Sequence, residues 1–346
     1  PAVLPDGRNV LLLKVLMTNA CENDCFYCAN RCSRDFPRLS FRPEELAELF
    51  MSLYHNRRVQ GLFLSSAISR GSAATMEKMI KTAEILRLKH KFGGYIHLKI
   101  LPGASFDYVQ RAVELASRVS VNLEAPSKGR LLKITSSKDF ENDLLLRMKW
   151  VKSLTSQENF LPAGQTTQFV VGAADESDRE ILETTDYLYR EVNLTRAYFS
   201  AFQPLKDTPL EEHPPTPLMR EHRLYQADFL LRRYGFKFNE IVFDERGNLP
   251  LDMDPKMAWV LKHPREFPVE INKADGNTLL RVPGIGPKSA ARIIKARAKN
   301  KFYTLDELKE VGVVVKRAAP FILIDGRPQG ESTQLPLKTL PLCSDI

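Results

Sequence analysis

The chain has 346 residues, 43% of them hydrophobic and 27% charged, a composition that excludes a disordered or fibrous protein and suffices for a large hydrophobic core. It has no run of about eighteen apolar residues and no N-terminal basic segment followed by an apolar stretch, so we expect a cytoplasmic protein without membrane contact. The formal net charge of +8 favours a polyanionic partner. Residues 270–327 carry twelve Lys and Arg against six Asp and Glu, so much of the positive charge lies near the C-terminus.

Short apolar segments alternate with longer helical patterns along the first two thirds of the chain, and this alternation is typical of βα units around a parallel sheet. The expected strands are residues 10–17, 61–65, 95–101, 119–124, 167–172 and 197–202. The expected helices between them are residues 43–55, 76–90, 106–116, 139–154 and 178–191. The fold class is therefore α/β, a partial (β/α)6 barrel with its active site at the C-terminal ends of the strands.

Prolines interrupt the pattern after residue 202, and a helix over residues 218–234 is expected to close or buttress the barrel. Further on, Gly and Pro residues indicate a linker, and short helical segments follow it. We therefore expect four parts: a barrel with its buttress helix at 1–245, a linker at 246–269, a small all-α domain at 270–327, and a disordered tail at 328–346.

Four of the five cysteines lie close together, directly after the first expected strand. Such a grouping in a chain of this length favours a metal site in a reducing compartment over a disulfide framework. Three thiolates, from Cys21, Cys25 and Cys28, can bind three irons of a [4Fe–4S] cluster, and the fourth iron is then open to the amino-acid moiety of S-adenosylmethionine (SAM). The alternative is a zinc site with Cys32 as a fourth ligand.

The C-x3-C-x-aromatic-C spacing, with Tyr27 before the last cysteine, resembles the radical SAM superfamily. That resemblance implies a barrel that binds a [4Fe–4S] cluster and SAM and forms a 5′-deoxyadenosyl radical. At the end of the second strand this chain has Ser65 and Ser66 where many relatives have an acid that meets the methionine amino group. Recognition of that group would then use hydroxyl and carbonyl acceptors.

Later strand ends supply further candidate contacts to the cofactor. Asn122 and Glu124, after the fourth strand, resemble the Asn-x-acid segment that implies contacts to the ribose hydroxyls; the alternative is an ordinary solvated strand exit. Gly172 belongs to a segment that resembles a Gly-rich turn near the adenine. Lys99 on the third strand, or Lys138, is a candidate for the cofactor carboxylate, with a surface position of Lys99 as the alternative.

Near the C-terminus, two expected helices are joined by a Gly-Ile-Gly turn. The glycines permit close approach of a phosphate to the N–H groups that open the second helix. The segment resembles the helix-hairpin-helix motif of DNA repair and recombination proteins, which contacts the phosphate backbone without reading sequence. The residues expected to bind nucleic acid are Gly284, Ile285, Gly286, Lys288, Ser289 and Arg292, with the Ile285 side chain in the core between the helices.

A second, degenerate hairpin over residues 305–316 has Val314 in place of its second glycine and is expected to pack against the first. The alternative for both hairpins is a protein-interaction or purely structural role.

Together, residues 10–324 resemble a family of radical SAM proteins assigned to DNA modification or repair. The resemblance implies an enzyme that abstracts hydrogen from a base or sugar of a nucleic acid, DNA in preference to RNA, with an electron donor such as a flavodoxin or ferredoxin. One alternative is an enzyme that modifies tRNA or another RNA. Another is a non-catalytic nucleic-acid-binding protein with a structural metal site.

Overall fold

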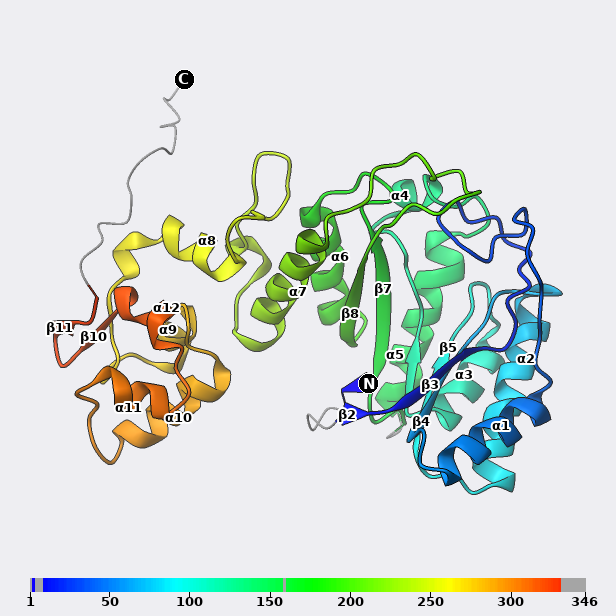
Figure 1. Ribbon diagram of the computed structural model, residues 1–346, viewed down its shortest axis with the longest axis horizontal. Helices are drawn as coiled ribbons and strands as arrows, with labels where there is room; N and C mark the ends of the chain where they lie inside the picture. The colour runs from blue at the N-terminus through cyan, green and yellow to red at the C-terminus, as the bar shows by residue number, and fades with distance from the viewer. Residues whose placement is uncertain (1, 4–8, 158–159, 331–346) are drawn as a thin grey trace. The chain divides into compact units, whose positions relative to one another are not determined.

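The computed structural model describes residues 2–3, 9–157 and 160–330, and the chain divides into two compact units, Pro1–Glu221 and His222–Ile346 (Figure 1). The boundary lies inside helix α7 (Leu218–Arg233). It therefore falls earlier in the chain than the linker expected at 246–269. No helix among the described residues is long and apolar enough to cross a membrane.

The first unit is built on a parallel sheet whose six strands follow one another in space as they do in sequence. They are β3 (Leu12–Leu16), β4 (Gly61–Ser65), β5 (Tyr95–Lys99), β6 (Arg118–Ser120), β7 (Gln165–Val171) and β8 (Leu194–Ala201). Within the described residues the edge strands β3 and β8 do not pair, so the sheet is an open barrel. The expected partial (β/α)6 barrel is confirmed.

Helices connect successive strands and pack along the outside of the sheet (Figure 1). Phe50 and Leu46 of the first helix are completely buried, as expected of an amphipathic helix that covers a sheet. The helices of this unit are α1 (Pro43–His55), α2 (Gly71–Glu84), α3 (Phe106–Leu115), α4 (Lys128–Leu132), α5 (Leu146–Gln157), α6 (Asp178–Glu191) and the start of α7, with π-helical turns η1 (Ile85–Lys89) and η2 (Phe140–Leu145). A two-stranded ribbon, β1 (Ala2–Val3) with β2 (Asn9–Val10), precedes β3.

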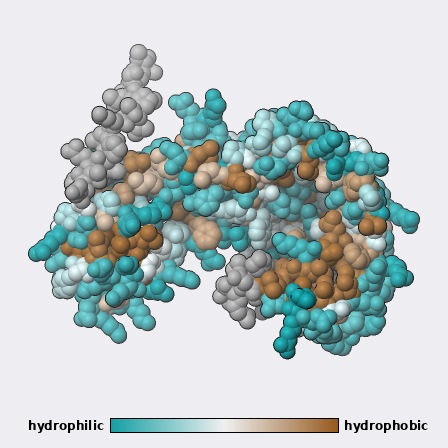
Figure 2. Space-filling model, viewed as in Figure 1, coloured by the Kyte–Doolittle hydropathy of each residue, from teal (hydrophilic) through white to brown (hydrophobic). Residues whose placement is uncertain are grey.

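Figure 2 shows hydrophobic side chains gathered over β3 to β5 on one face of the first unit, where the barrel is open. Leu11, just before β3, is 52% exposed, and Leu16 at the end of β3 is 36% exposed. In the middle of the sheet, β6 and β7 are covered on both faces: all three residues of β6 and six of the seven residues of β7 are buried. The open side of the barrel is thus beside its first strand.

The second unit combines short helices with a three-stranded sheet in the order β11-β10-β9. This domain was expected to be all-α, but it also contains strands. The segment expected as a linker contains a helix with Trp259 and Val260 buried. The remaining elements are η3 (Phe238–Glu240), α8 (Pro255–Lys262), η4 (Pro264–Glu266), β9 (Val269–Glu270), α9 (Gly276–Arg281), α10 (Pro287–Arg297), α11 (Leu305–Glu310), α12 (Val315–Ala318), η5 (Ala319–Phe321), β10 (Ile322–Ile324) and β11 (Arg327–Pro328). Most of the expected tail, residues 331–346, lies outside the described residues.

Candidate active site

A cavity of about 500 Å³ lies at the C-terminal ends of the barrel strands. Its wall includes ten of the eleven residues that the sequence analysis assigned to the cluster or to the cofactor, all except Gly172. These residues are Cys21, Cys25, Tyr27, Cys28, Ser65, Ser66, Lys99, Asn122, Glu124 and Lys138. The sheet register brings these positions together, because the carboxyl ends of parallel strands meet at one edge.

The loop between β3 and α1, which carries the cysteines, is held by an arginine that sequence analysis missed. The Arg38 guanidinium donates four hydrogen bonds of 2.7–2.9 Å to backbone carbonyls of this loop, at Asn19, Asn30, Arg31 and Arg34. A planar group with five N–H donors can satisfy several carbonyls at once. The loop therefore has a defined shape although it contains no regular secondary structure.

Two of the three thiols have polar contacts, one with a residue outside the loop and one within it. The Cys25 Sγ lies 3.5 Å from the Thr135 hydroxyl, and the Asn30 N–H points to the Cys28 Sγ at 3.4 Å. Burial raises the pKa of the Cys28 thiol. Bound iron would reverse that shift, since a cation stabilises the thiolate.

Cys32 differs from the three thiols of the cavity. It is exposed, whereas Cys25 is buried and Cys21 and Cys28 are partly buried. It is also absent from the wall of the cavity. In the described part of the chain, no group of three His, Cys, Asp or Glu side chains is placed to hold a single metal ion. A four-iron cluster does not require such convergence, because each thiolate binds a different iron.

One part of the cavity wall is a buried ion pair between Lys138 and Glu124. The Lys138 Nζ lies 3.5 Å from the Glu124 Oε1, and the two side chains are 9% and 7% exposed. Desolvation would lower the pKa of Lys138, but the negative charge of Glu124, together with that of Cys25 and Cys28 in their thiolate form, outweighs it and the pKa is raised. Burial raises the pKa of Tyr27 well above its usual range, and its hydrogen bond to Glu124 acts in the same direction.

Glu124 also has an unusual backbone conformation, with φ at +63°. Its N–H donates to the Gln168 carbonyl and its carbonyl accepts from the Val170 N–H, at 2.9 and 2.8 Å. The strand β6 has already ended at Ser120, so Glu124 is held by β7 rather than by its own strand. A left-handed glutamate costs conformational energy, and such positions gather at functional sites.

The other polar groups of the cavity have unused bonding capacity. The Ser66 Oγ is buried and has no hydrogen-bond partner among the described residues. The Lys99 ammonium also forms no hydrogen bond or ion pair within the described ranges, and burial lowers its pKa. A buried donor or acceptor without a partner costs stability unless a ligand satisfies it. Together with three thiols, these groups fit an iron–sulfur cluster and a ligand that has amino, carboxylate and hydroxyl groups.

Gly172 is not part of the cavity wall. It follows β7 with φ at +89°, and a Cβ atom there would overlap the Thr216 hydroxyl. Its carbonyl lies 2.9 Å from the His213 Nε2, and its N–H donates to the buried Glu176 carboxylate. The structure thus gives Gly172 a role in the turn after β7.

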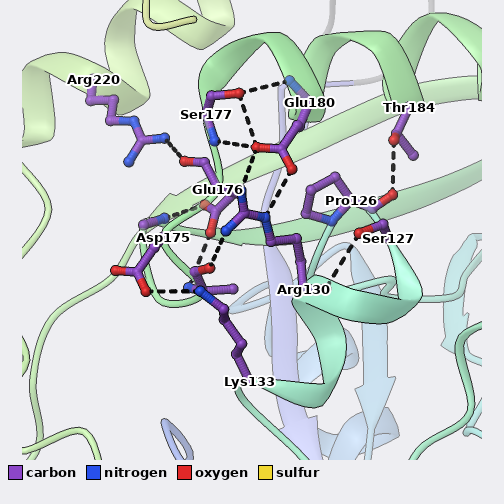
Figure 3. A network of polar contacts seen from close by, with 12 residues as sticks. Pro126, Ser127, Arg130, Lys133, Asp175, Glu176, Ser177, Glu180, Thr184 and Arg220 are labelled. Carbon is purple, nitrogen blue, oxygen red and sulfur yellow. Dashed lines mark hydrogen bonds and ion pairs between the residues drawn. The ribbon is translucent and has the colours of Figure 1, made fainter. Parts of the chain in front are cut away.

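That turn is fastened to α4 by the network in Figure 3. The Arg130 guanidinium donates to both carboxylate oxygens of Glu180, at 2.8 and 3.0 Å, and also to the Ala174 carbonyl. Lys133 pairs with Asp175 at 3.2 Å. Since α4 follows Glu124 in the chain and α6 follows the turn, these contacts fix the segment after β6 and the segment after β7 relative to each other.

In the second unit, the first hairpin joins α9 to α10 through Gly284-Ile285-Gly286. Ile285 is 1% exposed, which confirms its expected place in the core. Gly284 has φ at +84°, and a Cβ atom there would lie 2.5 Å from the Val314 carbonyl oxygen. The Val314 N–H donates to the Gly284 carbonyl at 3.0 Å. The second hairpin packs on the first, as expected.

Of the remaining hairpin residues, Lys288 and Arg292 are exposed on α10. Ser289 is 7% exposed, and its hydroxyl donates to the Gly312 carbonyl at 2.6 Å. This serine hydroxyl therefore joins the two hairpins. For a phosphate, the start of α10 offers the backbone N–H groups of Gly286, Lys288 and Ser289. Lys256, which sequence analysis missed, is buried and donates to the Ile285 carbonyl at 2.6 Å.

An open parallel barrel with three thiols on its first loop defines a class of enzymes that hold an iron–sulfur cluster at the strand ends. A family model described as the radical SAM superfamily matches residues 15–188, half of the chain. The chain belongs to the radical SAM superfamily, whose members use a [4Fe–4S] cluster and SAM. A model described as a helix-hairpin-helix motif matches residues 266–318, which contain both hairpins.

Two solved structures share the barrel fold. Methylornithine synthase (PylB) is 15% identical with a TM-score of 0.52, over 65% of this chain and 63% of that chain. HydG, a maturase of the [FeFe]-hydrogenase, is 11% identical with a TM-score of 0.50, over 65% of this chain and 50% of that chain. The chain thus spans less than two thirds of either protein, and at these identities the likeness concerns the fold. No curated protein matches the sequence.

Proposed function

We propose that the chain is a radical SAM enzyme that modifies or repairs a nucleic acid, DNA in preference to RNA, which its helix-hairpin-helix unit holds. The observation that carries the proposal is that one chain contains both the cavity with three thiols and a hairpin with exposed Lys288 and Arg292. When bound, the cluster and SAM supply a 5′-deoxyadenosyl radical, which can take a hydrogen atom from an unactivated carbon.

The chain's own residues would bind and orient the cofactor. Cys21, Cys25 and Cys28 hold the cluster and leave one iron for the amino acid moiety of SAM. Ser66, whose hydroxyl lacks a partner among the described residues, accepts a hydrogen bond from the methionine amino group. Lys99 meets the carboxylate, since its ammonium is not paired within the described ranges, whereas Lys138 already neutralises Glu124.

The ribose would be bound by residues of the β6 exit. A carboxylate accepts two hydrogen bonds from a diol, and the amide of Asn122 adds a further donor or acceptor. One Glu124 carboxylate oxygen faces Lys138 and the carboxylate also accepts a hydrogen bond from Tyr27, so its remaining acceptor sites would serve the ribose. The left-handed backbone of Glu124, held by β7, sets the direction of its side chain.

For the substrate, the support is the chemistry of the first hairpin. Backbone N–H groups at the start of α10, together with two exposed cations, suit backbone phosphates and read no base. A nucleotide must leave its stack before a radical in a barrel can reach it. An electron donor such as a flavodoxin or ferredoxin would reduce the cluster in the cell.

The first experiment tests the chemistry. Anaerobic reconstitution should give a brown protein with about four irons per chain, and dithionite with SAM should release 5′-deoxyadenosine. A colourless zinc protein would contradict the enzyme assignment.

The second experiment tests the substrate class. We expect Lys288→Glu to weaken binding of the reconstituted protein to DNA and to lower the slope of log affinity against log salt by about 1. Lys295→Glu, the same charge reversal in the last turn of α10, is the matched control. Parallel titrations with RNA of the same sequence decide between DNA and RNA. Equal binding by the Lys288 and Lys295 variants would instead assign the hairpin to protein interaction.

A further inference from the structure

The second unit contains a cavity of about 560 Å³ directly beside the first hairpin, which we call the hairpin cavity. One side of it is the Gly284-Ile285-Gly286 turn with Ser289. Facing the turn are three aromatic residues, Tyr225 and Phe229 of α7 and Tyr234 just after it. The motif itself requires a phosphate site only, so these rings are a feature that phosphate binding does not explain.

Polar groups line the part of the hairpin cavity nearest the turn. A Cβ atom added to Gly286 would lie 3.2 Å from the Tyr234 hydroxyl oxygen, so this hydroxyl borders the backbone that opens α10. The Lys256 ammonium lies 4.9 Å from the centroid of the Tyr234 ring and uses one hydrogen for the Ile285 carbonyl. A lysine amino group has at least two hydrogens, so at least one more is available to a ligand.

The polar groups of the wall and of the neighbouring helix α10 suit an anion. The one carboxylate in the wall, from Asp254, is ion-paired with Arg317. The amino group of Lys256, whose side chain is buried with the residue 7% exposed, adds N–H donors. Exposed Lys288 and Arg292 follow on the same helix as Ser289. A phosphate at the hairpin would thus be surrounded by cations and N–H donors.

The aromatic part of the wall suits a nucleobase. Phe229 is 48% exposed, although burying such a ring is favourable. Aromatic side chains beside a cationic groove are the usual platform for bases of single-stranded nucleic acid, because every base has a face that can stack. The bases of an intact duplex are stacked on one another and cannot enter a cavity.

We infer that the hairpin cavity accepts an unpaired nucleobase, stacked on Phe229, from a strand whose backbone phosphate lies at the first hairpin turn. The inference rests on the proposed nucleic-acid substrate and narrows it to a single strand or an unstacked nucleotide.

The test uses the full-length reconstituted protein and three fluorescent probes: a thymidine strand of about fifteen nucleotides, an abasic strand with the same number of phosphates, and a duplex of that length. We expect Phe229→Ala to weaken binding of the thymidine strand about tenfold, the loss of one stacked base. Its affinity for the abasic strand and its salt slope should match those of the wild type. Phe229→Trp keeps an aromatic ring at this position and should bind the thymidine strand as tightly as the wild type does.

Tyr303→Ala is the matched control, since Tyr303 is an aromatic residue that is 63% exposed and lies outside the wall of the hairpin cavity. Unchanged binding of the thymidine strand by Phe229→Ala would overturn the inference, as would equal affinity of the wild type for thymidine and abasic strands. In both cases the proposed nucleic-acid substrate survives. If none of the three probes binds, the proposed substrate fails as well. Circular dichroism melting checks that each variant is folded.

Discussion

The ammonium of Lys138 lies 3.5 Å from a carboxylate oxygen of Glu124, with both side chains less than a tenth exposed, on the wall of the cavity that also contains the three thiols. The two residues are in different segments, one at the exit of β6 and one before η2. Their contact therefore links the backbone of the two segments at the proposed cofactor site.

We predict that Lys138→Met lowers the free energy of unfolding by about 3 kcal/mol, because it leaves the Glu124 carboxylate buried without its partner. The double variant Glu124→Gln/Lys138→Met should recover part of this loss. Urea denaturation under anaerobic conditions measures both. Lys133→Met is the control: Lys133 and Asp175 are 49% and 65% exposed, so removing their pair should change stability by less than about 1 kcal/mol. Equal effects of the two single variants would refute the prediction.

The cysteines should separate into two classes. Cys25→Ser, which changes a thiol in the cavity, should abolish retention of about four irons per chain on reconstitution, whereas Cys32→Ser should keep them. Iron analysis and absorbance spectra of the two variants, reconstituted in parallel, make the comparison. If the Cys32→Ser variant also lost its iron, Cys32 would have to be counted among the metal ligands.

The hairpin glycines should differ in tolerance. Gly284→Ala should destabilise the second unit by about 2 kcal/mol or more, since it adds a Cβ against the Val314 carbonyl at a positive φ. Gly276→Ala, with a normal φ and its nearest neighbour at 3.4 Å, is the control and should have little effect. Thermal melts of the two variants would show the difference. Matching melting temperatures would mean that the hairpins can move apart at little cost.

Burial lowers the pKa of Lys256 to about 7 from a usual value of 10.5. Between these two values the unfolded chain holds the proton and the folded chain does not, so folding is disfavoured at low pH and stability rises with pH. From pH 7 to 9 this lysine should add about 2 kcal/mol. Lys256→Met should remove that increment, which unfolding curves of both proteins at the two pH values would measure. A Lys256→Met protein whose stability changes with pH as the wild type's does would exclude the shifted lysine.

Much of the first unit could be predicted locally. The helices at 43–55 and 178–191 were predicted with their exact bounds, because proline or serine with nearby acids marks the N-terminus of each. The fourth strand was expected to reach Glu124 but ends at Ser120. Apolar residues continue past the end of this strand, because Leu123 and Ala125 are buried by tertiary packing although they are not part of the sheet strand.

In the second unit, local signals were weaker. The segment 246–269 contains four prolines and one glycine and was expected as a linker, yet it includes the helix α8 with Trp259 buried. Trp259 packs against Phe267, which follows α8, and against Phe236, which lies before the whole segment. Burial of this kind overrides turn propensity and has no local signature.

By itself, the sequence determined the groups that carry chemistry: three cysteines at cluster spacing after a strand, polar residues at later strand ends, and a Gly-Ile-Gly turn with cations after it. Spacing along the chain is sufficient for these, because a strand exit and a helix start are local structures. Only the tertiary structure decided which groups remain available. It paired Lys138 with Glu124 but not Lys99, assigned the Ser289 hydroxyl to Gly312, and placed Phe229 and Lys256 beside the hairpin. These assignments depend on contacts between residues far apart in sequence, whose distances no local pattern encodes.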